Sequence, residues 1–240
     1  AYGYRDQLQD CLCLVYSRPD VVRTHIIRCA YHQSWEGDVM HWWFFKNGKI
    51  YGIRSKCSDD LLFLPLVTAD YIRKTGDTGL LNVPVRYLTS HPLEKGERFE
   101  TPARADLKEC VYLHCMRAIS RAISLTGQQG LCLMGSCDWN DGFSAVGAGG
   151  KGESVFTTLL LGLVCREFSS ICRLYGDTEG EKHLLQKHEE IKEKIKSIFT
   201  VDRFPRATFD DGTVMGVEDA LECKIDILSQ CFAAILLGKT

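Results

Sequence analysis

The chain has 240 residues, of which 45% are hydrophobic and 25% are charged. These values are typical of an ordinary soluble protein that buries one substantial core. The formal net charge is −2, and the basic residues are scattered along the chain. This composition excludes the basic patch of a protein that binds nucleic acid or an anionic membrane surface.

Hydrophobic residues recur at helical spacing along most of the chain. In one such run, Asp106 with Glu109 three residues later forms a capping-box pattern, which predicts that a helix begins there, and Gly127 follows its end. In chain order, the predicted helices lie at residues 5–16, 18–33, 59–75, 107–123, 154–175, 181–199 and 222–236. Segments with strand periodicity are scarce, so the sequence predicts an all-α protein.

The most apolar stretch, residues 155–164, is closed by Arg166 and Glu167. It is much shorter than the roughly 20 residues that span a bilayer, so we expect a buried helix and no membrane segment. No basic start precedes an apolar run as it does in a signal peptide. The chain begins with Ala1 inside a motif described below, which indicates a piece of a longer protein.

Twelve cysteines occur in the chain, and six of them lie in apolar runs that are predicted to be helical. These six are Cys11, Cys13, Cys110, Cys115, Cys165 and Cys172. We interpret these cysteines as reduced thiols that pack as small core residues. Reduced thiols are typical of the cytoplasm, so we expect a cytoplasmic protein. No Cys-x-x-Cys pair is present, so no structural zinc or other metal site is expected.

The most informative segment is residues 135–142, Gly-Ser-Cys-Asp-Trp-Asn-Asp-Gly. It places the carboxylates of Asp138 and Asp141, the indole of Trp139 and the amide of Asn140 between glycines. A carboxylic acid beside an aromatic ring can stay protonated and protonate a glycosidic oxygen, while the ring stacks on a sugar. The alternative is a turn built by Asp and Asn side chains.

Further motifs accompany this segment in a fixed order. They are Tyr-Gly-Tyr-Arg-Asp at 2–6, Glu-Gly-Asp-Val-Met-His-Trp-Trp at 36–43, Arg-Ser-Lys-Cys-Ser-Asp-Asp at 54–60, Gly-Glu-Ser-Val at 152–155, Arg-Ala at 206–207 and Asp-Asp-Gly at 210–212. Together they resemble the signatures of glycoside hydrolase family 94, the inverting phosphorylases related to cellobiose and chitobiose phosphorylase. The similarity extends over residues 2–238. It is greatest to the phosphorylase-like domain of cyclic β-1,2-glucan synthases and to 1,2-β-oligoglucan phosphorylases.

The resemblance implies a fold and a domain organisation. Family members have an (α/α)6 barrel of the six-hairpin glycosidase type, with the motif loops at one end of the paired helices. Seven predicted helices would form part of such a barrel, so we expect residues 1–240 to be part of one catalytic domain. The N-terminal β-sandwich and the C-terminal segment of the family have no counterpart in the chain.

The resemblance also implies roles for single residues. Asp141 matches the family's general acid, Trp139 lies beside the acid and contacts the sugar, and Arg5 with Asp6 holds the nonreducing glucose. Inorganic phosphate takes the place of the base-activated water of an inverting hydrolase, so one carboxylate suffices and no cofactor is needed. The other candidate substrate-binding residues are Asp138, Asn140, Asp60, Trp43, Glu222 and Gln230.

Each candidate also has a structural interpretation, and the sequence leaves both open. Arg5 and Asp6 can form an ion pair at a helix start. Asp59 and Asp60 can lie at the start of a helix, where their negative charges interact favourably with the helix dipole and Ser58 caps the helix. The structural alternatives for other residues are core packing for Trp42, Trp43 and His114, and a capping or structural carboxylate for Glu153.

The chain departs from the family pattern at three positions. Phe44 stands where relatives usually have a second histidine, which puts one hydrogen bond to sugar or phosphate in doubt. Cys137 replaces the glycine before the Asp-Trp pair, and Phe143 replaces a common methionine. None of these changes affects Asp141.

We therefore expect phosphorolysis of a β-linked, β-1,2 glucooligosaccharide to α-glucose 1-phosphate, in a protein that relatives indicate is a homodimer. Its partners would be the oligosaccharide and phosphate, without nucleic acid or membrane. The alternatives are a noncatalytic glucan-binding domain and an inverting hydrolase with Glu222 as its second carboxylate.

Overall fold

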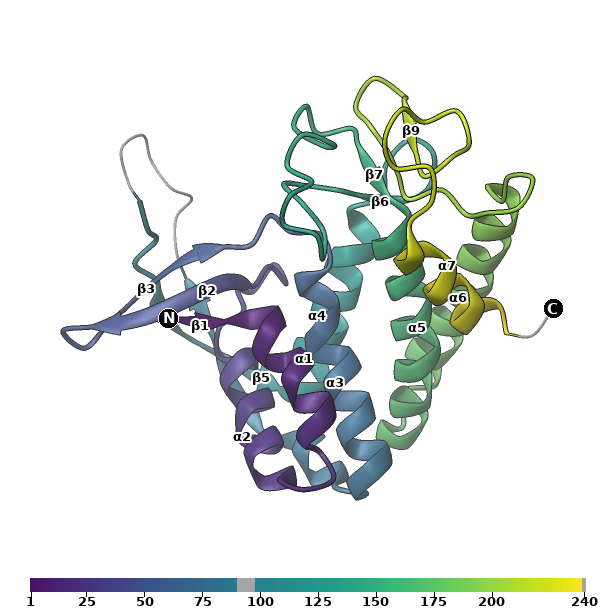
Figure 1. The fold of residues 1–240 in the computed structure, drawn as a ribbon. Coiled ribbons are helices and arrows are strands. Elements are labelled where there is room, and N and C mark those ends of the chain that lie inside the picture. Colours follow the sequence, from purple (N-terminus) through teal and green to yellow (C-terminus); the bar gives the residue numbers. More distant parts are fainter. Residues whose placement is uncertain (90–97, 239–240) are drawn as a thin grey trace. The chain divides into compact units, whose positions relative to one another are not determined.

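The computed structural model describes residues 1–89 and 98–238, which divide into two compact units. The first unit comprises residues 1–55 and 60–121, and the second comprises residues 56–59 and the chain from 122 onward. The described residues form seven α-helices, as the sequence predicts, together with three antiparallel sheets (Figure 1). The prediction of an all-α protein is therefore wrong, because both units contain antiparallel strands as well as helices, and the (α/α)6 barrel is not confirmed.

Four helices carry the core of the first unit. They are α1 (Tyr4–Leu14), α2 (Pro19–Ala30), α3 (Asp60–Thr75) and α4 (Val111–Ser124). Pro19 stands at the first position of α2, where its missing N–H costs no hydrogen bond. Leu8, Ile26 and Leu62 are fully buried, one from each of the first three helices. These side chains are the apolar face that the helical spacing predicts.

A three-stranded sheet precedes α3 in the chain. It consists of β1 (Tyr2–Gly3), β2 (Met40–Lys46) and β3 (Lys49–Arg54), in the order β1-β2-β3. Asn47 and Gly48 join β2 to β3, and both have positive φ angles of 51° and 71°. Asn-Gly is the preferred pair for a two-residue hairpin turn, because both positions need this left-handed conformation.

The second sheet corrects one predicted helix boundary. Strands β4 (Pro84–Thr89) and β5 (Ala103–Cys110) pair antiparallel after the short 3-10 helix η1 (Thr78–Asn82). Asp106 and Glu109 lie in β5, so they form no capping box, and α4 begins only at Val111. Glu109 instead receives hydrogen bonds from Arg117, at 2.8 and 3.1 Å, and from the Tyr87 hydroxyl at 2.7 Å.

The second unit has a sheet of four two-residue strands. In the order β6-β7-β8-β9, these are β6 (Cys132–Leu133), β7 (Glu153–Ser154), β8 (Ala207–Thr208) and β9 (Val214–Met215). All neighbouring strands are antiparallel. Because β7 ends where the next helix begins, the sheet fixes the position of that helix start.

Three helices complete the second unit: α5 (Val155–Tyr175), α6 (Thr178–Ser197) and α7 (Ile227–Leu237). Gly176, with φ of 89°, ends α5, and the Asp177 carboxylate caps α6 through the Gly180 amide. Helix α5 is long and apolar enough to cross a membrane, but 83% of its most apolar window is buried in the fold. The buried helix expected from residues 155–164 is therefore confirmed.

Candidate active-site loop

The loop of residues 135–142 is shaped by its own side chains. Asp138 Oδ1 accepts a hydrogen bond from the Asn140 amide at 3.0 Å, and Asn140 Oδ1 accepts one from the Gly142 amide at 3.0 Å. These are two successive turns in which a side chain binds the backbone two residues on. The turn interpretation of this segment is therefore confirmed for Asp138 and Asn140.

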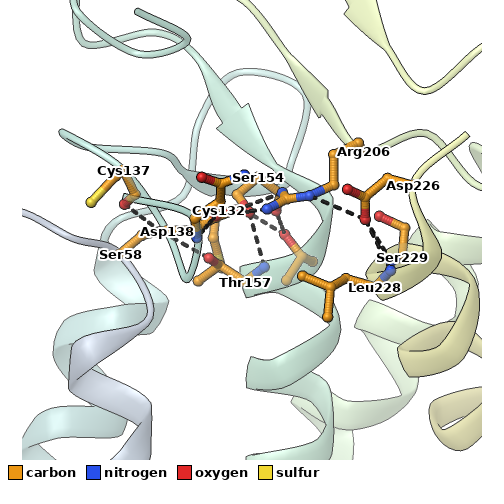
Figure 2. A network of polar contacts seen from close by, with 12 residues as sticks. Ser58, Cys132, Cys137, Asp138, Ser154, Thr157, Arg206, Asp226, Leu228 and Ser229 are labelled. Carbon is orange, nitrogen blue, oxygen red and sulfur yellow. Dashed lines mark hydrogen bonds and ion pairs between the residues drawn. The ribbon is translucent and has the colours of Figure 1, made fainter. Parts of the chain in front are cut away.

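Asp138 is fully buried and paired with an arginine. Its two oxygens lie 2.6 and 2.7 Å from the two terminal nitrogens of Arg206, which is also fully buried. The Ser154 hydroxyl donates a third bond to Asp138 Oδ2 at 2.6 Å. Figure 2 shows the guanidinium, the carboxylate and the hydroxyl converging from three segments. These contacts give the Asp138 carboxylate a structural role, and a sugar contact of this residue stays a prediction.

The same network reaches the first turns of two helices (Figure 2). Ser154 accepts the Thr157 amide at 3.0 Å and so caps α5. Arg206 Nε lies 3.4 Å from Asp226 Oδ1, and the Asp226 carboxylate caps α7 through the Leu228 amide at 2.9 Å. One guanidinium therefore links the loop to the starts of α5 and α7. Sequence analysis noted the Arg-Ala motif but not this role.

Two other side chains of the loop are exposed. Trp139 is 43% exposed, and Asp141 is exposed as well. The Cys137 thiol donates toward Asp141 Oδ1 at a distance of 3.9 Å. Residues 138 and 140 thus build the turn, whereas residues 139 and 141 present an indole and a carboxylate to solvent. An exposed carboxyl group can serve as the general acid that cleavage of a glycosidic bond needs, and an exposed indole can stack on a sugar ring.

The remaining candidates in the second unit lie elsewhere. The side-chain amide of Gln230 is hydrogen-bonded to both backbone groups of Phe204, at 2.9 and 2.8 Å, so it has a structural role. Glu222 is exposed in the loop before α7, which begins five residues later than predicted. Glu153 is buried and accepts the amides of Gln129 and Leu131, in agreement with its structural interpretation.

In the first unit, Arg5 and Asp6 lie in the first turn of α1. Arg5 is buried, whereas the Asp6 side chain is 71% exposed, and their charged atoms are 3.6 Å apart. Both the ion pair and an exposed carboxylate are therefore present. The structure leaves these two residues as a candidate sugar contact.

Asp60 is a buried carboxylate at the first position of α3. The Ser55 hydroxyl donates to its Oδ2 at 2.6 Å, and His41 Nδ1 lies 2.8 Å from the same oxygen. The other oxygen, Oδ1, is buried and has no hydrogen-bond partner among the described residues. Ser58 does not cap this helix with its hydroxyl, which lies 2.8 Å from that of Thr157. Asp60 therefore belongs to a polar cluster with His41.

Trp43 is a core residue. It is fully buried and stacks on His32 with ring centroids 3.9 Å apart, and on Tyr2 at 5.7 Å. Its burial agrees with the core interpretation, and the substrate contact of Trp43 stays a prediction. His114 is also buried, with its two ring nitrogens near Gln33 and Val85 oxygens, as its core interpretation predicts.

Comparison with known proteins assigns the chain to a family. Residues 1–240 match the catalytic domain of the glycosyl hydrolase 94 superfamily. The chain belongs to this family. It is 36% identical over 242 residues to the cyclic β-(1,2)-glucan synthase NdvB of Rhizobium meliloti, covering 98% of this chain and 8% of that protein.

Two phosphorylases are more distant relatives. The chain is 27% identical to the solabiose phosphorylase of Paenibacillus borealis, over 97% of this chain and 28% of that protein. It is 23% identical to the N,N'-diacetylchitobiose phosphorylase of Vibrio proteolyticus, over 97% of this chain and 30% of that protein. The chain thus spans less than a third of the length of these relatives. The resemblance to family 94 inferred from the motifs is confirmed.

Proposed function

We propose that the protein carrying this chain cleaves β-glucosidic, β-1,2-linked oligosaccharides by inverting phosphorolysis and releases α-glucose 1-phosphate. The main support is the architecture of the loop at 135–142. Its buried Asp138 is held by Arg206, while Trp139 and Asp141, two positions apart in the chain, are exposed. Membership of family 94, with phosphorylases among its relatives, supports the reaction class.

In the proposed reaction, Asp141 donates a proton to the bridging oxygen as the glycosidic bond breaks. A phosphate oxygen attacks the anomeric carbon from the opposite face, so a β-linkage gives an α-phosphate. Trp139 contacts the sugar beside the acid. Arg5 and Asp6 are proposed to hold hydroxyls of the nonreducing glucose, since a charged pair fixes orientation through several hydrogen bonds.

The test measures glucose 1-phosphate release from β-1,2-glucooligosaccharides by the protein carrying this chain, with and without phosphate. We expect phosphate-dependent product, and a decrease of about 10²–10⁴-fold in Asp141→Asn, the usual contribution of a general acid. Asp202→Asn is the matched control, because it removes a carboxylate that is 60% exposed outside the loop. This variant should retain activity.

The other outcomes separate the alternatives. Free glucose released without phosphate would show a hydrolase instead, and Glu222→Gln would then test the second carboxylate. Oligosaccharide binding without any product would show a binding domain. Either result would overturn the proposed phosphorolysis.

A further inference from the structure

Two cysteines of the second unit lie in direct contact. Cys57 Sγ and Cys137 Sγ are 2.6 Å apart, and neither cysteine is in a disulfide bond. A disulfide bond is roughly 2.05 Å long, so a displacement of about half an ångström would bring the sulfurs to bonding distance.

The backbone holds the two cysteines together. The Ser58 amide donates to the Cys137 carbonyl at 2.9 Å, and the Ser136 amide donates to the Lys56 carbonyl at 2.8 Å. Gly135, with φ of +65°, permits this approach, because a Cβ there would lie 2.1 Å from the Lys56 carbonyl oxygen. The backbones of the two cysteines therefore cannot separate without breaking hydrogen bonds on both sides of the pair, so the two thiols stay within reach of each other.

The chemistry of this pair differs from that of other buried cysteines. A hydrogen bond from Cys57, and a weaker one from the Ser136 hydroxyl, lower the pKa of Cys137. Burial instead raises the pKa of Cys132 to about 11 and of Cys165 to about 12. Because the thiolate is the reactive form, Cys137 is the more reactive of these thiols.

We propose that Cys57 and Cys137 are a redox modification site that forms a reversible intramolecular disulfide with hydrogen peroxide as the oxidant. Peroxide fits because the two residues are only 7% and 5% exposed, so a small oxidant reaches them more readily than a bulky disulfide. Cys137 thiolate attacks one peroxide oxygen, which gives a sulfenic acid and, after protonation, water. Cys57 then attacks the sulfenic sulfur, loses its proton and displaces the hydroxyl as a second water. Two thiols are oxidised and one peroxide is reduced to two waters.

The disulfide would act on the proposed active-site loop. Cys137 directly precedes Asp138, and its thiol is the group that donates toward Asp141 at 3.9 Å. Oxidation removes that hydrogen and ties the start of the loop to residues 56–59. Resting on the proposed function, this predicts that oxidation lowers phosphorolysis at least five-fold and that dithiothreitol restores it.

The first test is independent of activity. The reduced protein is treated with hydrogen peroxide, remaining thiols are alkylated, and tryptic peptides are analysed by mass spectrometry. We expect peptide 57–73 to be joined to peptide 122–151 with the loss of two hydrogens. Cys132→Ser should retain this cross-link, which assigns it to Cys137, whereas Cys57→Ser and Cys137→Ser should each abolish it. Full alkylation of Cys57 and Cys137 after peroxide treatment of the folded protein would overturn the proposal.

The second test measures glucose 1-phosphate release before and after peroxide. Cys57→Ser should retain the activity of the reduced protein and resist peroxide. A cross-linked protein with unchanged activity would overturn regulation of the loop, though not the modification itself. A protein that forms the cross-link but never releases glucose 1-phosphate would instead overturn the proposed function. The two failures are therefore distinguishable.

Discussion

At the scale of the residue, Arg206 contacts several segments of the second unit from one buried position. Its guanidinium binds both oxygens of Asp138 and lies 4.7 Å above the Phe143 ring. Removing one partner of a buried ion pair typically costs about 3–5 kcal/mol, because the other charge is left uncompensated. We therefore expect Arg206→Met to lower the free energy of unfolding by about this amount, measured by urea denaturation.

The matched control is Arg18→Met. Arg18 also forms a two-contact ion pair, with Asp20, but both side chains are at least 60% exposed, so the free energy of unfolding should change little. Arg206→Lys should recover only part of the loss, because an ammonium cannot make the paired contacts of a guanidinium. Equal decreases in the free energy of unfolding for Arg206→Met and Arg18→Met would contradict the prediction that the buried pair stabilises the fold more than the exposed pair.

Sequence analysis identified the loop but not its partner. Asp-Trp-Asn-Asp between glycines indicates both a turn and acid chemistry, and the structure separates these functions by position. Asp138 and Asn140 form the turn, whereas Asp141 is exposed. Asp138 and Arg206 are 68 residues apart in the chain, and no local pattern predicts which arginine pairs with a given buried aspartate.

At the scale of the element, Ser154 forms hydrogen bonds with both a helix start and the loop of residues 135–142. It accepts the Thr157 amide as the N-cap of α5 and donates to Asp138. Ser154→Ala should lower the free energy of unfolding by about 1–2 kcal/mol from the lost cap alone. Ser170→Ala, a hydroxyl on the exposed side of the same helix, should have little effect in the same urea denaturation. A stability loss in Ser170→Ala as large as that in Ser154→Ala would contradict this role for the cap.

The helices were more predictable than the strands. Apolar spacing located seven helices, and the side chains of Ser154, Asp177 and Asp226 cap the starts of three of them. The β2–β3 hairpin has a clear signal in Asn47-Gly48, although residues 34–58 were predicted to be a loop between two helices. Strand β5 has no such signal. Its residues carry a capping-box pattern that predicts the start of a helix, but the segment pairs with β4 instead. Pairing with another strand determines the structure of that segment, and a single sequence does not show which strands pair.

At the scale of the whole molecule, acidification should destabilise the protein through buried histidines. Burial lowers the pKa of His25 and of His32 to about 4, from about 6.5 in an unfolded chain. The charge of Arg28 lowers the pKa of His25 further, whereas the hydrogen bond with the Arg28 carbonyl partly offsets the effect of burial on His32. His32 Nδ1 lies 2.7 Å from the Arg28 carbonyl, and its Nε2 is buried without a hydrogen-bond partner among the described residues. Protonation would therefore bury an unpaired charge.

Between these two pKa values the unfolded chain binds protons that the folded chain does not, so the free energy of unfolding falls as the pH falls from about 6.5 to about 4. The slope is at most about 1.4 kcal/mol per pH unit for each histidine, and it is absent above pH 7. Urea denaturation at pH 7, 6 and 5 measures it. His32→Phe keeps an aromatic ring against Trp43 but cannot be protonated. The dependence of the free energy of unfolding on pH should therefore decrease by the contribution of one proton. His183→Gln, at an exposed position of α6, should leave the slope unchanged. If His32→Phe keeps the slope of the parent chain, buried histidines do not set the acid sensitivity of this fold.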